Sequence, residues 1–367
     1  MLEVKHYPRE HYSTMFNPDT GFFARVEDEG EAEPFWSEHG PELLDISITN
    51  WCDRGCSVCY RDSNRTGRHM ATSDYEMIMA QAAEIGVLQV ALGGGNPNQH
   101  PEFCKILELT RLVYGIVPSY TTNGNGLSKA IVDESAEVCG AVAVSAYPPF
   151  KQTAAAIETL ALAGIRANLH FVLNADSVGT ALSWMKAPPS FLQKVNAVVF
   201  LNYKPVGRRA SGLLLAESPA LKEFFVLVQD AQLPYKVGFD SCMVSALASL
   251  TTINSSFYDA CEAGRFSMFI SETLQMYPCS FMEPMSDGVP VNGKNLLDTW
   301  QNGPAFQKIR GELQSAKCAN CRHAPTCKGG CPVFQEINLC DGARERHLKK
   351  VAGLEMEIKS LQKCNLF

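Results

Sequence analysis

Residues 43–59 read LLDISITNWCDRGCSVC, and this stretch decides the fold. Its first seven residues, 43–49, have the apolar and β-branched character of a strand. The strand leads directly into Cys52, Cys56 and Cys59, a Cys-x3-Cys-x2-Cys loop. Three thiolates on one tight loop can bind three irons of a cubane cluster, and with no fourth ligand nearby one iron stays open for a small molecule. The alternatives are a zinc site, which needs a fourth ligand and fits this spacing badly, and unrelated or redox cysteines.

Apolar strand-like runs alternate with helical segments up to about residue 215. We expect six strands and at least four helices between them. The strands are expected at 43–49, 87–92, 118–122, 141–145, 166–173 and 197–201, and the helices at 73–85, 102–114, 129–139 and 151–163. This alternation predicts an α/β fold with a parallel sheet covered by helices. Several strands end in Gly, Asn or Ser, which is where α/β barrels place their ligands.

The composition changes along the chain and predicts five segments. Residues 1–44 are a polar extension with a hairpin around the turn Asn17–Gly21. The partial barrel spans 45–215, and a helical bridge spans 216–240. Cysteine, glycine and proline then dominate 241–342, which we expect to be a separate cysteine-rich domain. Helical periodicity returns in the last segment, 343–367.

Charge and cysteine content exclude several classes of protein. The chain has 367 residues, 32 basic and 39 acidic, for a net charge of −7. An acidic chain without a basic run is a poor candidate for nucleic-acid binding. It contains neither a membrane-span-length apolar run nor a signal-peptide core, so we expect a cytoplasmic protein. In a reducing compartment its 14 cysteines indicate metal binding or catalysis, with the scattered Cys104, Cys139 and Cys364 expected to be ordinary buried thiols.

The first cysteine loop resembles the signature of the radical S-adenosylmethionine (SAM) superfamily. The resemblance implies that Cys52, Cys56 and Cys59 bind a 4Fe–4S cluster whose open iron chelates SAM. In that family the reduced cluster cleaves SAM to a 5′-deoxyadenosyl radical, which abstracts a hydrogen atom from substrate. A partial (β/α)6 barrel is the fold that this resemblance implies.

Further positions match family features that contact SAM. Gly94-Gly95-Asn96-Pro97 stands where the family commonly has Gly-Gly-Glu-Pro, with Asn96 in place of Glu. Val58 is a second departure, because an aromatic residue is usual there, and the next aromatic residue, Tyr60, is expected to cover the adenine instead. The resemblance implies that the cofactor contacts are Tyr60, Gly94, Gly95, Asn96, Asn123, Ser145, Asn174 and Lys204.

The second cysteine cluster resembles the SPASM extension of many radical SAM enzymes, which binds auxiliary 4Fe–4S clusters. The resemblance implies one cluster on Cys261, Cys279 and Cys331, and another on Cys318, Cys321, Cys327 and Cys340. This gives three clusters in all. A zinc ribbon is the alternative, because Cys318-x2-Cys321 alone fits one. His323 is expected to be a loop residue rather than a ligand.

Cys242 has three interpretations. It completes the first auxiliary cluster, or it donates a hydrogen atom to a substrate radical, or it is buried and inert. We favour ligation, because the eight cysteines from Cys242 to Cys340 would complete two four-cysteine sites.

SPASM extensions are common among enzymes that modify ribosomally made peptides. We therefore expect hydrogen abstraction from a peptide or protein residue, giving a cross-link, an epimer or an oxidised residue. In the anaerobic sulfatase maturases an Asp serves as base where Ser280 stands here, which counts against that activity. Residues 1–44 are too short for a full leader-binding module, so a leader would bind a separate protein or the barrel edge. The family also implies a flavodoxin or ferredoxin as electron donor. The alternatives are a small-molecule dehydrogenase and a non-catalytic zinc adaptor.

Overall fold

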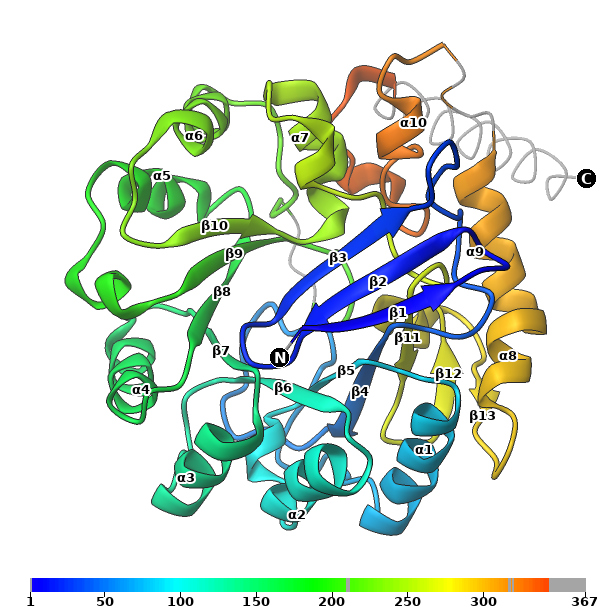
Figure 1. Cartoon of the computed structure of the whole chain (residues 1–367). Helices are drawn as coiled ribbons and strands as arrows, with labels where there is room; N and C mark the ends of the chain where they lie inside the picture. Colours follow the sequence, from blue (N-terminus) through cyan, green and yellow to red (C-terminus); the bar gives the residue numbers. More distant parts are fainter. Residues whose placement is uncertain (1, 209–211, 316–317, 319, 343–367) are drawn as a thin grey trace, which may run out of the picture.

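Two sheets and a set of flanking helices make up the protein (Figure 1). The computed structural model describes residues 2–208, 212–315, 318 and 320–342. The strands of the larger sheet are β4 (Leu43–Thr49), β5 (Gln89–Gly94), β6 (Val117–Thr122), β7 (Ala141–Ser145), β8 (Ala167–Leu173), β9 (Ala197–Asn202), β10 (Lys236–Phe239), β11 (Ser267–Ile270), β12 (Gln275–Tyr277) and β13 (Val289–Pro290).

The larger sheet is mostly parallel. Its strand order is β10-β9-β8-β7-β6-β5-β4-β11-β12-β13. The strands from β10 to β11 run parallel to their neighbours, and only β12 and β13 are antiparallel. The six expected strands are confirmed as β4 to β9. The segment expected to be a helical bridge, 216–240, also contributes β10, and the cysteine-rich segment contributes β11, so the parallel part is longer than expected.

Helices connect most of the successive parallel strands and lie around the outside of the sheet (Figure 1). The α-helices are α1 (Thr72–Glu84), α2 (Phe103–Glu108), α3 (Lys129–Val138), α4 (Lys151–Leu162), α5 (Val178–Lys186), α6 (Pro219–Asp230), α7 (Val244–Leu250), α8 (Leu296–Asn302), α9 (Pro304–Gln314) and α10 (Ala324–Cys327). A π-helical turn, η2 (Leu109–Val113), continues α2. The 3-10 turns are η1 (Pro97–Gln99), η3 (Ser190–Lys194), η4 (Ser241–Met243), η5 (Ser255–Phe257), η6 (Ser280–Met285) and η8 (Gln335–Ile337).

The two faces of the parallel sheet differ in chemistry. Alternate residues such as Ile46, Val90 and Leu169 are fully buried in the main hydrophobic core. Their neighbours on the opposite face are small or polar and only partly buried, as at Ser119 and Ser145. Because side chains alternate along a strand, this pattern gives an apolar outer face under the helices and a polar inner face.

The N-terminal segment forms the smaller sheet, whose three antiparallel strands are β1 (Glu3–Tyr7), β2 (Tyr12–Asn17) and β3 (Phe22–Glu27). The expected hairpin at Asn17–Gly21 is β2–β3, and β1 was not anticipated. Phe16 packs with Leu88 and Val117, which lie at the amino ends of β5 and β6. The smaller sheet therefore covers the end of the barrel opposite the strand ends that carry the cysteine loop.

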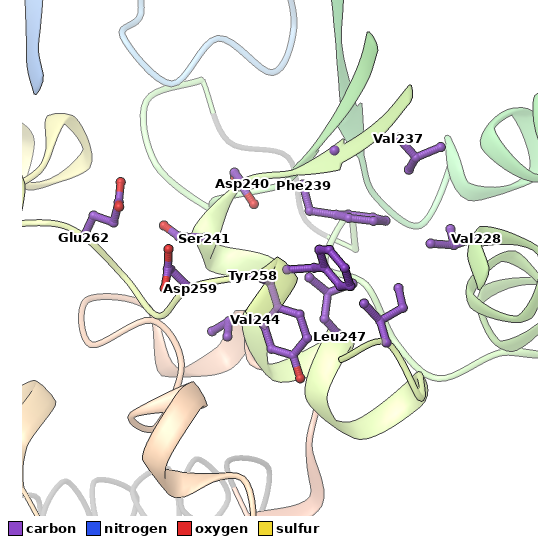
Figure 2. Close-up of a pocket in the computed structure, with 13 residues that line it drawn as sticks. Val228, Val237, Phe239, Asp240, Ser241, Val244, Leu247, Tyr258, Asp259 and Glu262 are labelled. Carbon is purple, nitrogen blue, oxygen red and sulfur yellow. The ribbon is translucent and has the colours of Figure 1, made fainter. Parts of the chain in front are cut away.

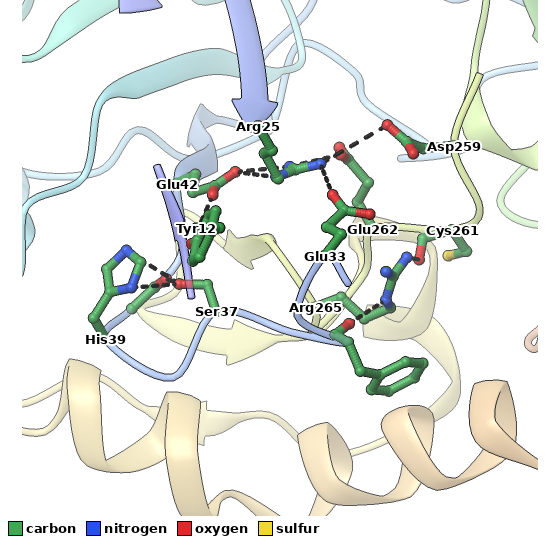
Figure 3. A network of polar contacts seen from close by, with 12 residues as sticks. Tyr12, Arg25, Glu33, Ser37, His39, Glu42, Asp259, Cys261, Glu262 and Arg265 are labelled. Carbon is green, nitrogen blue, oxygen red and sulfur yellow. Dashed lines mark hydrogen bonds and ion pairs between the residues drawn. The ribbon is translucent and has the colours of Figure 1, made fainter. Parts of the chain in front are cut away.

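A buried guanidinium fastens the smaller sheet to the rest of the protein (Figure 3). Arg25 on β3 lies 2.7 Å from Glu42, 3.0 Å from Glu262 and 3.3 Å from Glu33, measured between nitrogen and oxygen atoms. The side chains of Arg25 and Glu42 are 9% and 4% exposed. Glu42 immediately precedes β4, and Glu262 follows Cys261. One side chain thus joins the smaller sheet, the start of the barrel and the cysteine-rich segment.

In the part of the chain that the structure describes, no helix has both the length and the apolar character needed to cross a membrane. The predicted C-terminal helix in 343–367 lies outside the described residues. The division of the chain into five segments stays a prediction.

Replacing Arg25 tests the anchoring role of its ion pairs. Arg25→Ala leaves Glu42 buried without its cation, so we expect the free energy of unfolding to fall by about 3 kcal/mol. Lys129→Ala is the control, because Lys129 is 87% exposed and pairs only with Asp133; it should change stability by less than about 0.5 kcal/mol. Urea unfolding followed by circular dichroism measures both, and equal effects of the two variants would contradict the role given to Arg25.

Candidate active site

The first three cysteines lie together just beyond the carboxyl end of β4. Cys52 is buried, and Cys56 and Cys59 are partly buried. Burial raises the pKa of Cys56, and the neighbouring Cys59 and Cys52 add to this rise, so the three sulfurs share one small region. Three clustered thiols with partial access to solvent are a donor set that fits three irons of a cubane cluster.

Gly207 and Arg208 hold the cysteine loop from the segment after β9. The Arg208 backbone N–H donates to the Cys59 carbonyl at 2.9 Å, and its side chain donates to the carbonyls of Cys56 at 3.3 Å and Ser63 at 2.7 Å. Gly207 has φ +68°, and a Cβ atom there would overlap the carbonyl oxygens of Cys59 and Tyr60. Only glycine combines this backbone conformation with so close an approach.

Gly94 and Gly95 support the loop from the other side. We expected these glycines to let the main chain approach SAM. In the structure they let the chain before Cys52 approach them: a Cβ on Gly94 would overlap the Thr49 carbonyl, and one on Gly95 the Trp51 carbonyl. The Gly95 N–H donates to the Thr49 carbonyl at 2.7 Å. Direct contact of either glycine with SAM stays a prediction.

Asn96 is enclosed by protein. It is fully buried, and its carbonyl oxygen accepts from the Thr122 hydroxyl at 3.1 Å and the Asn123 backbone N–H at 3.0 Å. Its amide group donates to the Asn125 carbonyl at 3.2 Å. Both lone pairs of the side-chain oxygen are therefore in use, so Asn96 joins the end of β5 to the loop after β6 rather than presenting a free acceptor to an ammonium group.

Asn123 connects that loop to the first cysteine. Its amide nitrogen lies 3.6 Å from the Cys52 sulfur and 3.0 Å from the Asp53 carboxylate, which Asn125 also contacts at 2.9 Å. Burial tends to raise the pKa of Asp53, but hydrogen bonds from Gln99, Asn123 and Asn125 outweigh it and hold the pKa below its usual value. Asp53 is therefore an ionised anchor for the cysteine loop at neutral pH. Sequence reasoning missed this role because its partners are about 70 residues away.

The remaining predicted cofactor residues have different surroundings. Tyr60 packs on Phe281, with ring centroids 4.7 Å apart, and Ser145 is partly buried on the inner face at the end of β7. The Asn174 side-chain oxygen accepts from the backbone N–H groups of Asp176 and Ser177, both at 2.9 Å. Asn174 thus caps the turn before α5, and a contact with SAM from any of these residues stays a prediction.

Lys204 lies next to the second group of cysteines rather than in an open nucleotide pocket. It is buried and forms an ion pair with Asp240. Burial favours a lower pKa for Lys204, but Asp240 outweighs it and the nearby Cys242 and Cys331 raise the pKa further. Lys204 therefore supplies a fixed positive charge beside these two thiols.

Four cysteines from separate segments meet beside Lys204. Cys242 shares a hydrogen bond with Cys331, which together with burial raises the pKa of Cys242 well above its usual value. Burial also raises the pKa of Cys261, with Cys242 and Cys279 adding to the rise. The structure thus brings together the three thiols expected for the first auxiliary cluster and Cys242, the proposed fourth. A set of four buried or partly buried thiols beside a fixed cation fits a 4Fe–4S cluster.

Cysteines expected for the second auxiliary cluster also gather. Burial raises the pKa of Cys327 to about 11, and Cys340 and Cys318 contribute to the rise. Cys321 is exposed, and its backbone N–H donates to the Cys318 carbonyl at 2.8 Å. His323 lies just before α10, where its Nε2 atom is 2.9 Å from Nε of Arg322. That His323 is not a ligand stays a prediction.

The scattered cysteines lie apart from these groups. Cys139 is partly exposed, but its thiol group is buried, and this burial raises the pKa of the thiol to about 12. Cys104 is on α2, and Cys364 lies outside the described residues. Among the residues that the structure describes, no three His, Cys, Asp or Glu side chains are close enough to bind a single metal ion.

Charged groups that sequence reasoning missed line the inner face of the barrel. Asp45 on β4 hydrogen-bonds Ser280, and burial raises its pKa to about 6. Arg61 lies 2.5 Å from Glu272 and also pairs with Glu283. A charged residue within the apolar strand 43–49 was a visible signal for Asp45. Nothing in the sequence indicated the pairing of Arg61 with a residue 211 positions away.

Comparison with known proteins identifies the domain that contains the three-cysteine loop. The sequence model of the radical SAM superfamily matches residues 46–146, which contain the three-cysteine loop, Gly94, Gly95 and Asn123. The chain thus contains a radical SAM domain. It is therefore a radical SAM enzyme, and a SAM-binding 4Fe–4S cluster follows from the family.

The chain is similar along most of its length to peptide maturases. It is 23% identical over 321 residues to the mycofactocin maturase MftC of Mycobacterium ulcerans, covering 80% of this chain and 84% of that protein. It is 23% identical over 323 residues to the PqqA peptide cyclase of Granulibacter bethesdensis, covering 79% and 82%. The crystal structure of Streptococcus suis SuiB bound to precursor peptide SuiA matches with a TM-score of 0.67 and 18% identity over 90% of this chain and 95% of SuiB.

Replacing Cys242 tests its place in the four-thiol group. Three clusters would need about twelve irons. If Cys242 is a ligand, Cys242→Ala should lower the iron content or alter the electron paramagnetic resonance of one cluster, because a ligand thiolate is lost. Cys139→Ala is the control and should leave both unchanged. If Cys242 is a hydrogen donor, the clusters and SAM cleavage persist while product fails. Unchanged iron, spectra and product would leave Cys242 an inert thiol.

Gly207→Ala tests the contact between the β9 segment and the cysteine loop. A Cβ atom at position 207 must displace the backbone at Cys59 and Tyr60. We therefore expect the free energy of unfolding to fall by about 2 kcal/mol or more and the iron content to fall as well. Gly164→Ala is matched in backbone conformation, with φ +74°, but a Cβ there meets nothing within 4 Å. It should cost only the conformational penalty of about 1 kcal/mol and retain full iron. Equal iron loss in both variants would show that the close approach at Gly207 is unimportant.

Proposed function

We propose that this radical SAM enzyme modifies a residue of a ribosomally made peptide, giving a cross-link, an epimer or an oxidised residue. The observation that carries the proposal is the grouping of the cysteines: one group on the barrel loop, and two in the segment that follows the barrel. The similarity to MftC, to a PqqA peptide cyclase and to SuiB, whose structure contains a precursor peptide, supports a peptide as substrate.

We assign the cluster ligands as follows. Cys52, Cys56 and Cys59 would hold the SAM-binding cluster, and the other eight would hold two auxiliary clusters: Cys242, Cys261, Cys279 and Cys331 for the first, and Cys318, Cys321, Cys327 and Cys340 for the second. When bound and reduced, the SAM-binding cluster together with SAM would supply a 5′-deoxyadenosyl radical that takes a hydrogen atom from the substrate. A small redox protein such as a flavodoxin or ferredoxin would supply the electron.

The protein's own residues position and shield this chemistry. Asn123 directs an amide N–H toward the Cys52 sulfur, and such hydrogen bonds tune the reduction potential of a cluster. Tyr60 follows Cys59, and Gly94 and Gly95 contact the chain before Cys52; with Ser145 at the end of β7 they would form the remaining SAM site. Asn96 supports this site by joining the end of β5 to the loop after β6, and Asn174 supports it through the turn that it caps.

The first auxiliary group faces the SAM loop. Tyr60 follows Cys59 directly, and its ring packs against Phe281, two residues after Cys279. This aromatic contact joins the residue after Cys59 to the segment that follows Cys279. Asp45 and Ser280 meet beside it, so a substrate residue in the barrel would lie between the SAM loop and the first auxiliary group.

Product analysis tests the proposal. The anaerobically reconstituted, reduced protein should convert SAM to 5′-deoxyadenosine, measured by liquid chromatography and mass spectrometry. Cys52→Ala removes one ligand of the SAM-binding cluster and should abolish this product. Formation at the rate of Cys52→Ala would contradict radical chemistry. If 5′-deoxyadenosine forms, mass spectrometry of peptides encoded beside the gene identifies the substrate, and a modified small molecule in their place would contradict peptide modification.

A further inference from the structure

A cavity of about 450 Å³ opens beside β10, outside the barrel (Figure 2). Its walls come from four parts of the chain: α6, β10, α7 and the segment 253–262. The residues of β10 and the turn after it, from Val237 to Ser241, all line it. The cavity therefore follows the length of this strand.

The strand beside the cavity has an open edge. In the described part of the chain, β10 pairs with β9 alone. The backbone N–H of Lys236 donates to the carbonyl of Asn196, just before β9, at 3.0 Å. The backbone N–H of Asp240 donates to the carbonyl of Phe200 on β9 at 3.1 Å. Because backbone groups alternate in direction along a strand, those of Val237 and Phe239 point away from β9. An open edge of this kind is a template for another extended chain.

One end of the cavity is apolar. Val228 from α6 and Leu247 from α7 contribute aliphatic side chains, and Phe257 stands at its border with 81% of its surface exposed. In Figure 2, Val228 and Val237 lie on the opposite side from the acidic residues. A phenylalanine so exposed beside a concave apolar surface is typical of a place where a ligand is bound.

The other end is acidic. Asp240, Asp259 and Glu262 line it, and none of the described lining residues carries a positive charge. Asp240 pairs with Lys204, and Glu262 with Arg25 at 3.0 Å. Asp259 forms a longer ion pair with Arg25, at 3.8 Å, and its side chain is 60% exposed. Most of the Asp259 surface is therefore open to a cation from solvent. Charge at this end complements a lysine or arginine.

We propose that this groove binds an extended segment of the peptide substrate, which adds as a strand to the open edge of β10. An aliphatic or aromatic side chain of the segment enters the apolar end, and a basic side chain lies against Asp259. The inference rests on the proposed function, because it takes the ligand to be the peptide. Four residues of strand at about 3.3 Å each span about 13 Å, which sets the length of the core contact.

The groove lies next to residues of the first auxiliary group. Its acidic end includes Ser241 and Glu262, the sequence neighbours of Cys242 and Cys261 in the first auxiliary group. A segment held along β10 is therefore anchored outside the barrel, next to the cysteine-rich wall of the site. Anchoring there raises the effective concentration of a linked residue at the SAM loop.

A labelled peptide tests the groove directly. The probe is fluorescein-Thr-Val-Thr-Val-Lys-Lys-amide, with Glu-Glu in place of Lys-Lys as the matched control peptide. Binding to the full-length, anaerobically reconstituted protein is measured by fluorescence anisotropy. We expect saturable binding of the lysine peptide in the micromolar to sub-millimolar range, and binding at least about tenfold weaker for the glutamate peptide.

Two variants with matched controls locate the binding. Val237→Pro removes a backbone donor on the open edge and leaves the bonds to β9 in place, so affinity should fall about tenfold, whereas Val237→Ala keeps the donor and should stay within about threefold. Asp259→Asn should weaken the lysine peptide about threefold or more, whereas Asp230→Asn, at the end of α6 and outside the lining, should not.

Each outcome separates this inference from the proposed function. No saturable binding up to about 2 mM, or binding unaffected by Val237→Pro, overturns the groove. Dimerisation in analytical ultracentrifugation that Val237→Pro abolishes would assign the edge to a second copy of the chain and overturn a peptide occupant. The wild-type protein is assayed separately for 5′-deoxyadenosine without peptide, and its absence would overturn the proposed function whatever the anisotropy shows.

Discussion

Close backbone contact around the cysteine loop is the constraint on which the rest of the structure depends. Three thiols on one loop can share a cluster only if the loop has a single conformation. Glycine backbone packs against the cysteine loop from two sides. Gly94 and Gly95 contact the chain before Cys52, and Gly207 contacts Cys59 and Tyr60. These contacts join β4, β5 and the segment after β9. The carboxyl edge of the sheet is therefore tied together at the site where chemistry takes place.

Buried charges complete this fastening at longer range. Arg25 links the smaller sheet to the chain before β4 and to the residue after Cys261, while Arg61 links the end of the cysteine loop to Glu272 and Glu283. Buried ion pairs contribute little net stability, but separating one is costly, so they favour one arrangement of segments over others. Both arginines join the barrel to the cysteine-rich segment. The relative positions of the cysteine groups thus depend on charge pairing as well as on the hydrophobic core.

Sequence patterns predicted the local elements and the cysteine sets, because both are written in short-range spacing. The six strands β4 to β9 were visible as apolar runs, and most of the cysteines that the motifs grouped lie near one another, while their role as cluster ligands stays a prediction. β10 and β11 were missed because four-residue strands have no measurable periodicity and their pairing is long-range. The partners of Asn96 and Lys204 were missed for a related reason. A polar residue at a strand end is equally suited to a ligand or to a turn, and only the fold decides which.

The two edges of the larger sheet are finished differently, and this difference bears on access to the site. On one side, β12 and β13 continue the sheet beyond β11 as antiparallel strands. On the other side, within the residues that the structure describes, the sheet ends at β10, a four-residue strand that contains Gly238. Natural proteins usually protect such an edge, and shortness is one form of protection. Here the edge also lies along a cavity that is apolar at one end and acidic at the other, beside Cys242 and Cys261. A chain that only needed to avoid aggregation would have no reason to place a binding cavity there, so the open edge is best explained as part of the path to the site.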